Sequence, residues 1–131
     1  VSGKMYLNLG SFKFQDITEV TGTVTDRWVT GVSVVDINQD QLPDLYLGVS
    51  GPYSAKRSNL LYINQGNNAE GIPEFREMAA DYGLDFDGFT THAAFLDFDR
   101  DNDLDVYLLN AANTEFYGNK IRPSRNDGQA F

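Results

Sequence analysis

An acidic stretch reads DINQDQLPD from Asp36 to Asp44, and a second version reads DFDRDNDLD from Asp97 to Asp105. Oxygen-bearing side chains occupy positions 1, 3, 5 and 9 of both stretches. Alternate residues of a tight loop turn their oxygens inward, and Ca²⁺ accepts many oxygen ligands in a flexible geometry. The spacing therefore predicts one Ca²⁺ ion in each loop.

The ligands of the two predicted sites follow from this spacing. The residue at position 7 is expected to add its backbone carbonyl, as in other calcium loops. The first site is predicted at Asp36, Asn38, Asp40, Leu42 and Asp44. The second site is predicted at Asp97, Asp99, Asp101, Asp103 and Asp105. We expect the second site to bind more tightly, because its side-chain ligands include one more carboxylate.

Each acidic stretch lies between two short apolar runs. Residues 32–35 and 45–49 flank the first stretch, and residues 93–96 and 106–109 flank the second. Two short apolar runs joined by a polar turn predict a β-hairpin. The sequence therefore predicts a cation held in the turn of a hairpin, twice.

Two other interpretations of the acidic stretches are less consistent with the sequence. A helix-loop-helix calcium site needs a glutamate at position 12, but Leu47 and Leu108 stand there. Solvated turns are often rich in Asp and Asn, because these side chains hydrogen-bond locally. Three or four carboxylates in one turn repel each other, however, and this repulsion favours a bound cation.

The two stretches belong to a longer internal repeat. A shift of 61 residues aligns residues 14–46 with residues 75–107 without a gap, and a shift of 56 aligns residues 6–10 with 62–66. Each unit then contains about four short strands, which is typical of propeller blades. The predicted fold is all-β, with two four-stranded antiparallel propeller-type blades that carry calcium-binding hairpin loops. The expected divisions are repeat 1 at 1–57, repeat 2 at 58–113, and an inter-blade loop or tail at 114–131.

Composition narrows the possible partners. The formal net charge is −9, from 19 acidic and 10 basic residues, and eight of the acidic residues lie in the two loops. No basic face is present to attract phosphates, so nucleic-acid binding is not expected. Cysteine is absent, which excludes a disulfide framework and thiolate chemistry. No apolar run is long enough to predict direct membrane insertion.

The residues that carry these features resemble the FG-GAP/VCBS repeat family, the repeats of integrin α-type β-propellers and of many bacterial surface proteins. The likeness rests on the two acidic stretches with their following strands, on Asn64-Gln-Gly66, and on the Phe-x-Asp-Ile pattern at Phe14–Ile17. The pattern is most similar to the bacterial branch found with ASPIC/UnbV-type domains. Where that family has glycine at loop position 6, this chain has Gln41 and Asn102.

The resemblance implies a fold and a function. In this family the acidic loops bind Ca²⁺ between two strands of one blade, and the blades close into a ring. Two repeats cannot close such a ring, so we expect the chain to be a fragment of a larger β-propeller, with possible self-association through open strand edges. The expected function is a calcium-binding module that serves protein or glycan interaction or adhesion. Calcium sites of modest affinity suit an extracellular, periplasmic or cell-surface location.

The sequence leaves open two alternatives to an interaction module. One is part of a propeller enzyme that acts on polysaccharide, as a lyase or a hydrolase, and the other is a structural stalk. No residues combine into a nucleophile–base pattern, and the single histidine, His92, aligns with Gly31 in the other repeat. The sequence therefore predicts no catalytic residue.

Overall fold

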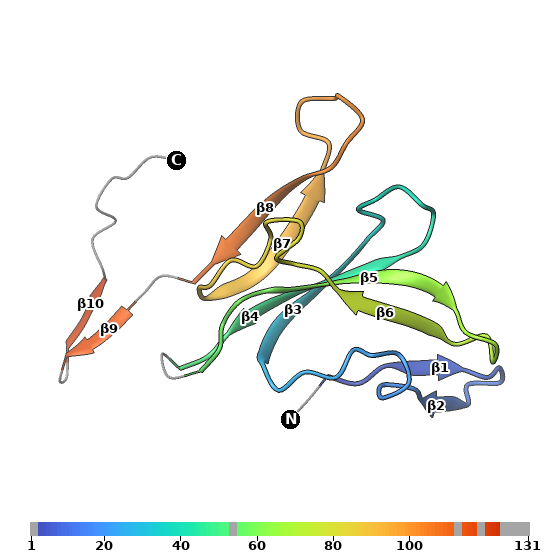
Figure 1. The fold of residues 1–131 in the computed structure, drawn as a ribbon. Coiled ribbons are helices and arrows are strands. Elements are labelled where there is room, and N and C mark those ends of the chain that lie inside the picture. Colours follow the sequence, from blue (N-terminus) through green and yellow to red (C-terminus); the bar gives the residue numbers. More distant parts are fainter. Residues whose placement is uncertain (1–2, 53–54, 112–113, 118–119, 124–131) are drawn as a thin grey trace.

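The computed structural model describes residues 3–52, 55–111, 114–117 and 120–123 (Figure 1). These residues form antiparallel strands joined by turns, and no helix occurs among them, so the all-β prediction is confirmed. The same ranges therefore hold no helix with the length and apolar character needed to cross a membrane. The strands are β1 (Tyr6–Asn8), β2 (Phe14–Asp16), β3 (Trp28–Val35), β4 (Asp44–Ser50), β5 (Leu60–Asn67), β6 (Pro73–Glu77), β7 (Thr90–Leu96), β8 (Asp105–Asn110), β9 (Thr114–Tyr117) and β10 (Lys120–Pro123).

One four-stranded sheet forms the centre of the described structure. Its strand order is β3-β4-β5-β6, and every neighbouring pair is antiparallel. Three two-stranded sheets, β1–β2, β7–β8 and β9–β10, accompany it. Figure 1 shows β7–β8 stacked beside β3 and β4, with the β1–β2 hairpin near β6.

The internal repeat is visible in the pairing of the strands. In β1–β2, Tyr6 pairs with Asp16, and in β5–β6, Tyr62 pairs with Glu77, its counterpart in the repeat. The next two pairs of each hairpin also correspond. The two hairpins therefore have the same register, although the second carries the longer connecting turn.

The hairpins that carry the acidic loops match equally well. Val35 pairs with Asp44 at the closed end of β3–β4, and Leu96 pairs with Asp105 at the closed end of β7–β8. Both hairpins also have an irregularity in register at the same place, near their open ends. Each repeat thus folds into two hairpins. We call β1–β2 and β5–β6 the outer hairpins, and we call β3–β4 and β7–β8, which carry the acidic loops, the inner hairpins.

The strand pairing differs from the prediction in its grouping. The central sheet joins the inner hairpin of residues 1–57 to the outer hairpin of residues 58–113, so it crosses the expected boundary between the repeats. In the described residues there is accordingly one four-stranded sheet, where two were predicted. An internal sequence repeat shows which hairpins are equivalent, but it does not show which neighbouring hairpins share a sheet. Residues 114–131 were expected to be a loop or tail, and they include the paired strands β9 and β10.

The hydrophobic core lies on both faces of the central sheet, because the side chains of β4 and β5 alternate between them. On one face Tyr46, Leu61 and Ile63 pack against β7–β8, where Tyr46 meets the Phe95 ring edge-to-face at 5.6 Å. On the other face the buried residues are Leu47, Leu60 and Tyr62. Strands that are buried on both faces have nearly continuous apolar sequences, and β4 and β5 are examples.

Close backbone approach joins the central sheet to β7. A Cβ atom on Gly31 of β3 would lie 2.7 Å from the carbonyl oxygen of Thr91, so only glycine fits there. On either side of this contact, the hydroxyl groups of Thr30 and Ser33 donate hydrogen bonds to the carbonyl oxygens of Thr90 and Ala93. These contacts fix the position of β7–β8 on the face of the central sheet.

A buried polar residue, Asn59, connects three segments at the edge of this core. Its Oδ1 accepts a hydrogen bond from the backbone N–H of Val49 at 2.8 Å. Its Nδ2 donates to the hydroxyl oxygens of Tyr46 at 2.8 Å and Thr90 at 2.9 Å. Because Asn59, Tyr46 and Thr90 are all fully buried, no water can replace these bonds at low cost.

We therefore predict that Asn59→Ala destabilises the fold by about 2–4 kcal/mol, since it leaves the buried N–H of Val49 without its acceptor and removes one hydrogen bond from each of two buried hydroxyl groups. The measurement is chemical denaturation followed by circular dichroism. Asn67→Ala, at an exposed position of β5, is the matched control and should change stability by less than about 0.5 kcal/mol. Equal effects of the two substitutions would refute the structural role of Asn59.

Candidate calcium-binding loops

The two acidic loops lie close together at one end of the molecule (Figure 1). Each connects the two strands of an inner hairpin, β3 to β4 or β7 to β8. The side-chain Nε2 of Gln39 in the first loop donates a hydrogen bond to the carbonyl oxygen of Asn102 in the second, at 2.7 Å. The stacking of β7–β8 on the central sheet thus brings the two predicted sites together.

The aspartate at position 1 organises the turn in both loops. The carboxylate of Asp36 accepts hydrogen bonds from the N–H groups of Asp40 at 3.0 Å and Gln41 at 2.9 Å. Asp97 accepts the corresponding bonds, from the N–H groups of the residues at positions 5 and 6, at 3.1 and 3.3 Å. A carboxylate that accepts two backbone N–H groups holds the chain in a tight turn.

The backbone of both loops enters the left-handed region at the same two positions. At position 6, Gln41 has a φ of 71° and Asn102 a φ of 75°. At position 4, Gln39 has a φ of 58° and Arg100 a φ of 66°. Left-handed residues other than glycine are uncommon, and asparagine adopts this conformation more readily than glutamine. The first loop therefore stores more backbone strain at position 6 than the second.

The aspartate at position 9 of the first loop ties the loop to the central sheet. Asp44 is fully buried, and its Oδ2 accepts a hydrogen bond from the N–H of Ile37 at 3.0 Å. Its Oδ1 accepts the N–H of Asn64, on the neighbouring strand β5, at 2.8 Å. Burial raises the pKa of Asp44, against the lowering effect of these two donors. A cation near the loop would favour the ionised form.

The equivalent aspartate of the second loop has a different environment. The Oδ2 of Asp105 accepts the N–H of Phe98 at 2.8 Å, which repeats the bond from Ile37 to Asp44. Asp105 is exposed, however, because β8 pairs only with β7 in the described part of the chain. Among the residues that the structure describes, no N–H takes the place of that of Asn64 beside Asp105.

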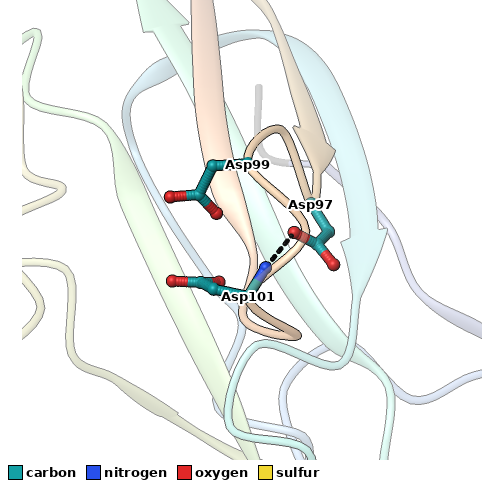
Figure 2. A group of neighbouring side chains, drawn as sticks. All are labelled: Asp97, Asp99 and Asp101. Atoms are coloured by element: carbon teal, nitrogen blue, oxygen red, sulfur yellow. Dashed lines mark hydrogen bonds between the residues drawn. The ribbon is translucent and has the colours of Figure 1, made fainter.

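Three carboxylates of the second loop converge. One oxygen from each of Asp97, Asp99 and Asp101 lies within 4.8 Å of the other two, and Figure 2 shows the three side chains, with the Asp97 carboxylate beside the backbone nitrogen of Asp101. Oxygens bound to one Ca²⁺ ion, at about 2.3–2.6 Å from it, lie no more than about 5 Å apart. Three carboxylate oxygens at this spacing could hold a metal ion.

Charge is crowded in this second loop. The pKa of Asp103 is raised, first by a hydrogen bond between its carboxyl group and that of Asp101 and then by the negative charge of Asp101. The pKa of Asp101 is lowered by hydrogen bonds from the backbone and side chain of Asp103. The two neighbouring carboxyl groups repel each other when both are ionised, and a divalent cation would relieve this repulsion.

The first loop has fewer acidic groups inside the turn. The side-chain amide of Asn38 donates a hydrogen bond to Asp40 Oδ2 at 2.8 Å, and the N–H of Leu42 donates to Asp40 Oδ1 at 2.8 Å. These bonds partly satisfy Asp40, and no group of three carboxylates forms in this loop. The structure therefore brings together Asp97, Asp99 and Asp101 as one group, and it holds Asp36, Asn38 and Asp40 through internal hydrogen bonds.

One residue of this region was not predicted as part of the site. Asn64 donates its N–H to Asp44 Oδ1, and its side-chain amide also donates to the carbonyl oxygen of Pro43 at 3.1 Å. Its Oδ1 accepts the N–H of Gly66 at 2.9 Å, in the turn that the Asn-x-Gly pattern indicates. The sequence did contain a signal for Asn64, because the same Asn-x-Gly pattern occurs at Asn8 in the other repeat. Asn64 reaches Asp44 because its strand, β5, pairs with β4.

Comparison of the chain with protein-family models, with curated proteins and with solved structures finds no match. The assignment of a function therefore depends on the geometry of the two loops and on the resemblance seen in the sequence.

The different environments of the two position-9 aspartates lead to a prediction. Asp44→Ala should destabilise the cation-free protein by about 3 kcal/mol, because it leaves two backbone N–H groups without a charged acceptor. Asp105→Ala should cost less than half as much, since water can reach the N–H that it frees. Urea denaturation of both variants in EDTA measures the difference. Equal losses would contradict the anchoring role of Asp44 in the central sheet.

Proposed function

We propose that the chain is a calcium-binding β-propeller repeat module that serves protein or glycan interaction at a cell surface or in a secreted protein. The observation that carries the calcium proposal is the convergence of Asp97, Asp99 and Asp101 in a loop whose backbone repeats in the first hairpin. The ion would be structural, because it would hold a turn between two strands. In this interpretation the two loops are corresponding sites in the two repeats, and they differ in their affinity for Ca²⁺.

The donor atoms favour calcium over other common metals. All predicted side-chain ligands are carboxylate or amide oxygens, which suit hard cations such as Ca²⁺ and Mg²⁺. Zn²⁺ prefers histidine and cysteine, neither of which occurs in the two loops. Mg²⁺ demands a small octahedral site and keeps several of its waters, whereas an open turn with many oxygens suits Ca²⁺.

The propeller interpretation is supported by the way the sheets stack. A four-stranded antiparallel sheet of short strands packs face to face on the next inner hairpin, and outer and inner hairpins alternate along the chain. Propeller blades are four-stranded sheets arranged in this repetitive way. The surface location and the adhesive role follow from the FG-GAP/VCBS resemblance and from the modest affinity expected of such loops.

Binding of two calcium ions would also change the charge of the molecule. The formal net charge of −9 would become −9 + 4 = −5. Eight of the 19 acidic residues lie in the loops, so the neutralisation would be concentrated at one end of the structure. Calcium would therefore reduce repulsion most strongly where Gln39 and Asn102 join the two loops.

We predict that calorimetric titration of the calcium-free chain with Ca²⁺ detects two binding events and that the second loop gives the tighter one. Asp97→Ala should remove the tighter event, and Asp36→Ala should remove the weaker one, because side-chain charge is greater and backbone strain is lower in the second loop. Asp81→Ala removes the same charge from an exposed turn outside the loops and is the control, which should retain both events.

Two results would contradict this assignment. If Asp97→Ala leaves the tighter event intact and Asp36→Ala removes it, the ranking of the sites is wrong. If the unmodified chain takes up no Ca²⁺ at millimolar concentration, the calcium proposal itself is wrong.

A further inference from the structure

A side chain of the first acidic loop reaches into the second loop. Gln39, at position 4 of the first loop, donates a hydrogen bond from its Nε2 to the carbonyl oxygen of Asn102, at position 6 of the second loop, over 2.7 Å. In the part of the chain that the structure describes, no other hydrogen bond joins the two loops. The link between the two predicted sites therefore depends on one side chain.

The backbone that Gln39 contacts is the backbone that holds two carboxylates of the second loop. The N–H of Asn102 donates to Asp97 Oδ2 at 3.3 Å, and the N–H of Asp103 donates to Asp101 Oδ1 at 3.1 Å. Asp97 and Asp101 are two of the three side chains that converge in this loop. The segment that orients them is thus held from outside by the first loop.

One peptide unit transmits the contact. The carbonyl oxygen of Asn102 and the N–H of Asp103 belong to the same peptide group, which is planar and rigid. Fixing the direction of the carbonyl therefore fixes the direction of the N–H that binds Asp101. A hydrogen bond to the carbonyl also polarises the N–H and strengthens the bond that it donates. Gln39 can thus act on Asp101 without touching it.

The support runs in one direction only. Arg100 occupies position 4 of the second loop and has the same left-handed backbone as Gln39, with φ values of 66° and 58°. Within the described ranges, however, Arg100 donates no hydrogen bond to the first loop. The first loop therefore supports the second, and the reverse contact does not occur.

This support matters for a loop that is crowded with charge. The second loop has an aspartate at every other position from Asp97 to Asp105. Their mutual repulsion favours an open turn when no cation is bound. The bond from Gln39 favours the closed turn, in which the carboxylates converge. Because the apparent affinity for a ligand falls with the fraction of molecules in the competent form, this bond should raise the affinity of the second loop for a cation.

We propose that Gln39 is a positioning residue for the calcium site of the second loop, so that a side chain of one repeat completes the loop of the other. This inference rests on the proposed calcium function and adds a determinant of affinity to it. The second loop then reaches its full affinity only when β7–β8 is stacked on the central sheet, because the stacking brings Gln39 and Asn102 together.

A nuclear magnetic resonance titration with Ca²⁺ tests this role, because the amide signals of Asp40 and Asp103 report on the first and second loops separately. Gln39→Ala should weaken the Ca²⁺ binding reported by Asp103 about threefold to fivefold. This range is the lower part of that for a neutral hydrogen bond, since the contact is exposed. The binding reported by Asp40 should change less than about twofold, because the first loop keeps its own hydrogen bonds.

Two further variants separate the hydrogen bond from other effects. Gln65→Ala removes a similar bond outside the loops, from Gln65 Nε2 to the carbonyl oxygen of Ile63 at 3.2 Å, and should leave both sites unchanged. Gln39→Glu keeps the size of the side chain but cannot donate to the carbonyl of Asn102 when ionised. Its added negative charge would by itself attract Ca²⁺, so a weaker second site in this variant identifies the hydrogen bond as the cause.

The possible failures are distinguishable. The positioning role would be overturned by an unchanged second site in Gln39→Ala, by equal weakening of both loops, or by a tighter second site in Gln39→Glu. The calcium proposal would survive each of these results, because Ca²⁺ would still bind. If the Asp103 signal of the unmodified chain does not respond to millimolar Ca²⁺, both proposals are wrong.

Discussion

The buried carboxylate of Asp44, which accepts two backbone N–H groups at the end of the first acidic loop, joins the loop to the central sheet. Asp44 closes the first loop through Ile37 and also reaches across to Asn64 on the next strand. The same side chain thus joins a turn, its own hairpin and the neighbouring hairpin. An ionised group in this position is costly to bury, and the cost is offset by hydrogen bonds and by any cation that the loop binds.

This constraint explains why the acidic pattern and the strand pattern occur together in the sequence. The aspartate at position 1 accepts two N–H groups of the turn, and the aspartate at position 9 fixes the base of the turn. The intervening carboxylates are then held inside a small volume, as Asp97, Asp99 and Asp101 are. The repulsion between them is a property of the closed turn, and the calcium ion that we propose would relieve it.

Much of the structure could be predicted from the sequence because the relevant signals are local. The hairpins around the acidic stretches and the Asn-x-Gly turns depend on residues within a few positions of each other. The grouping of hairpins into sheets could not be predicted, because it depends on pairing between β4 and β5, which belong to different repeats. The contact between Gln39 and Asn102 was missed for the same reason, since it requires the stacking of two sheets.

The most direct test of this account is the thermal unfolding of the unmodified chain with EDTA and with millimolar Ca²⁺, each followed by circular dichroism. A ligand that binds only the folded state at 100 times its dissociation constant adds about 2.7 kcal/mol of stability. We therefore expect Ca²⁺ to raise Tm by at least about 4 °C, and an equal concentration of Mg²⁺ to raise it less. Coincident unfolding curves in EDTA and Ca²⁺ would show that the carboxylates of the two loops need no cation.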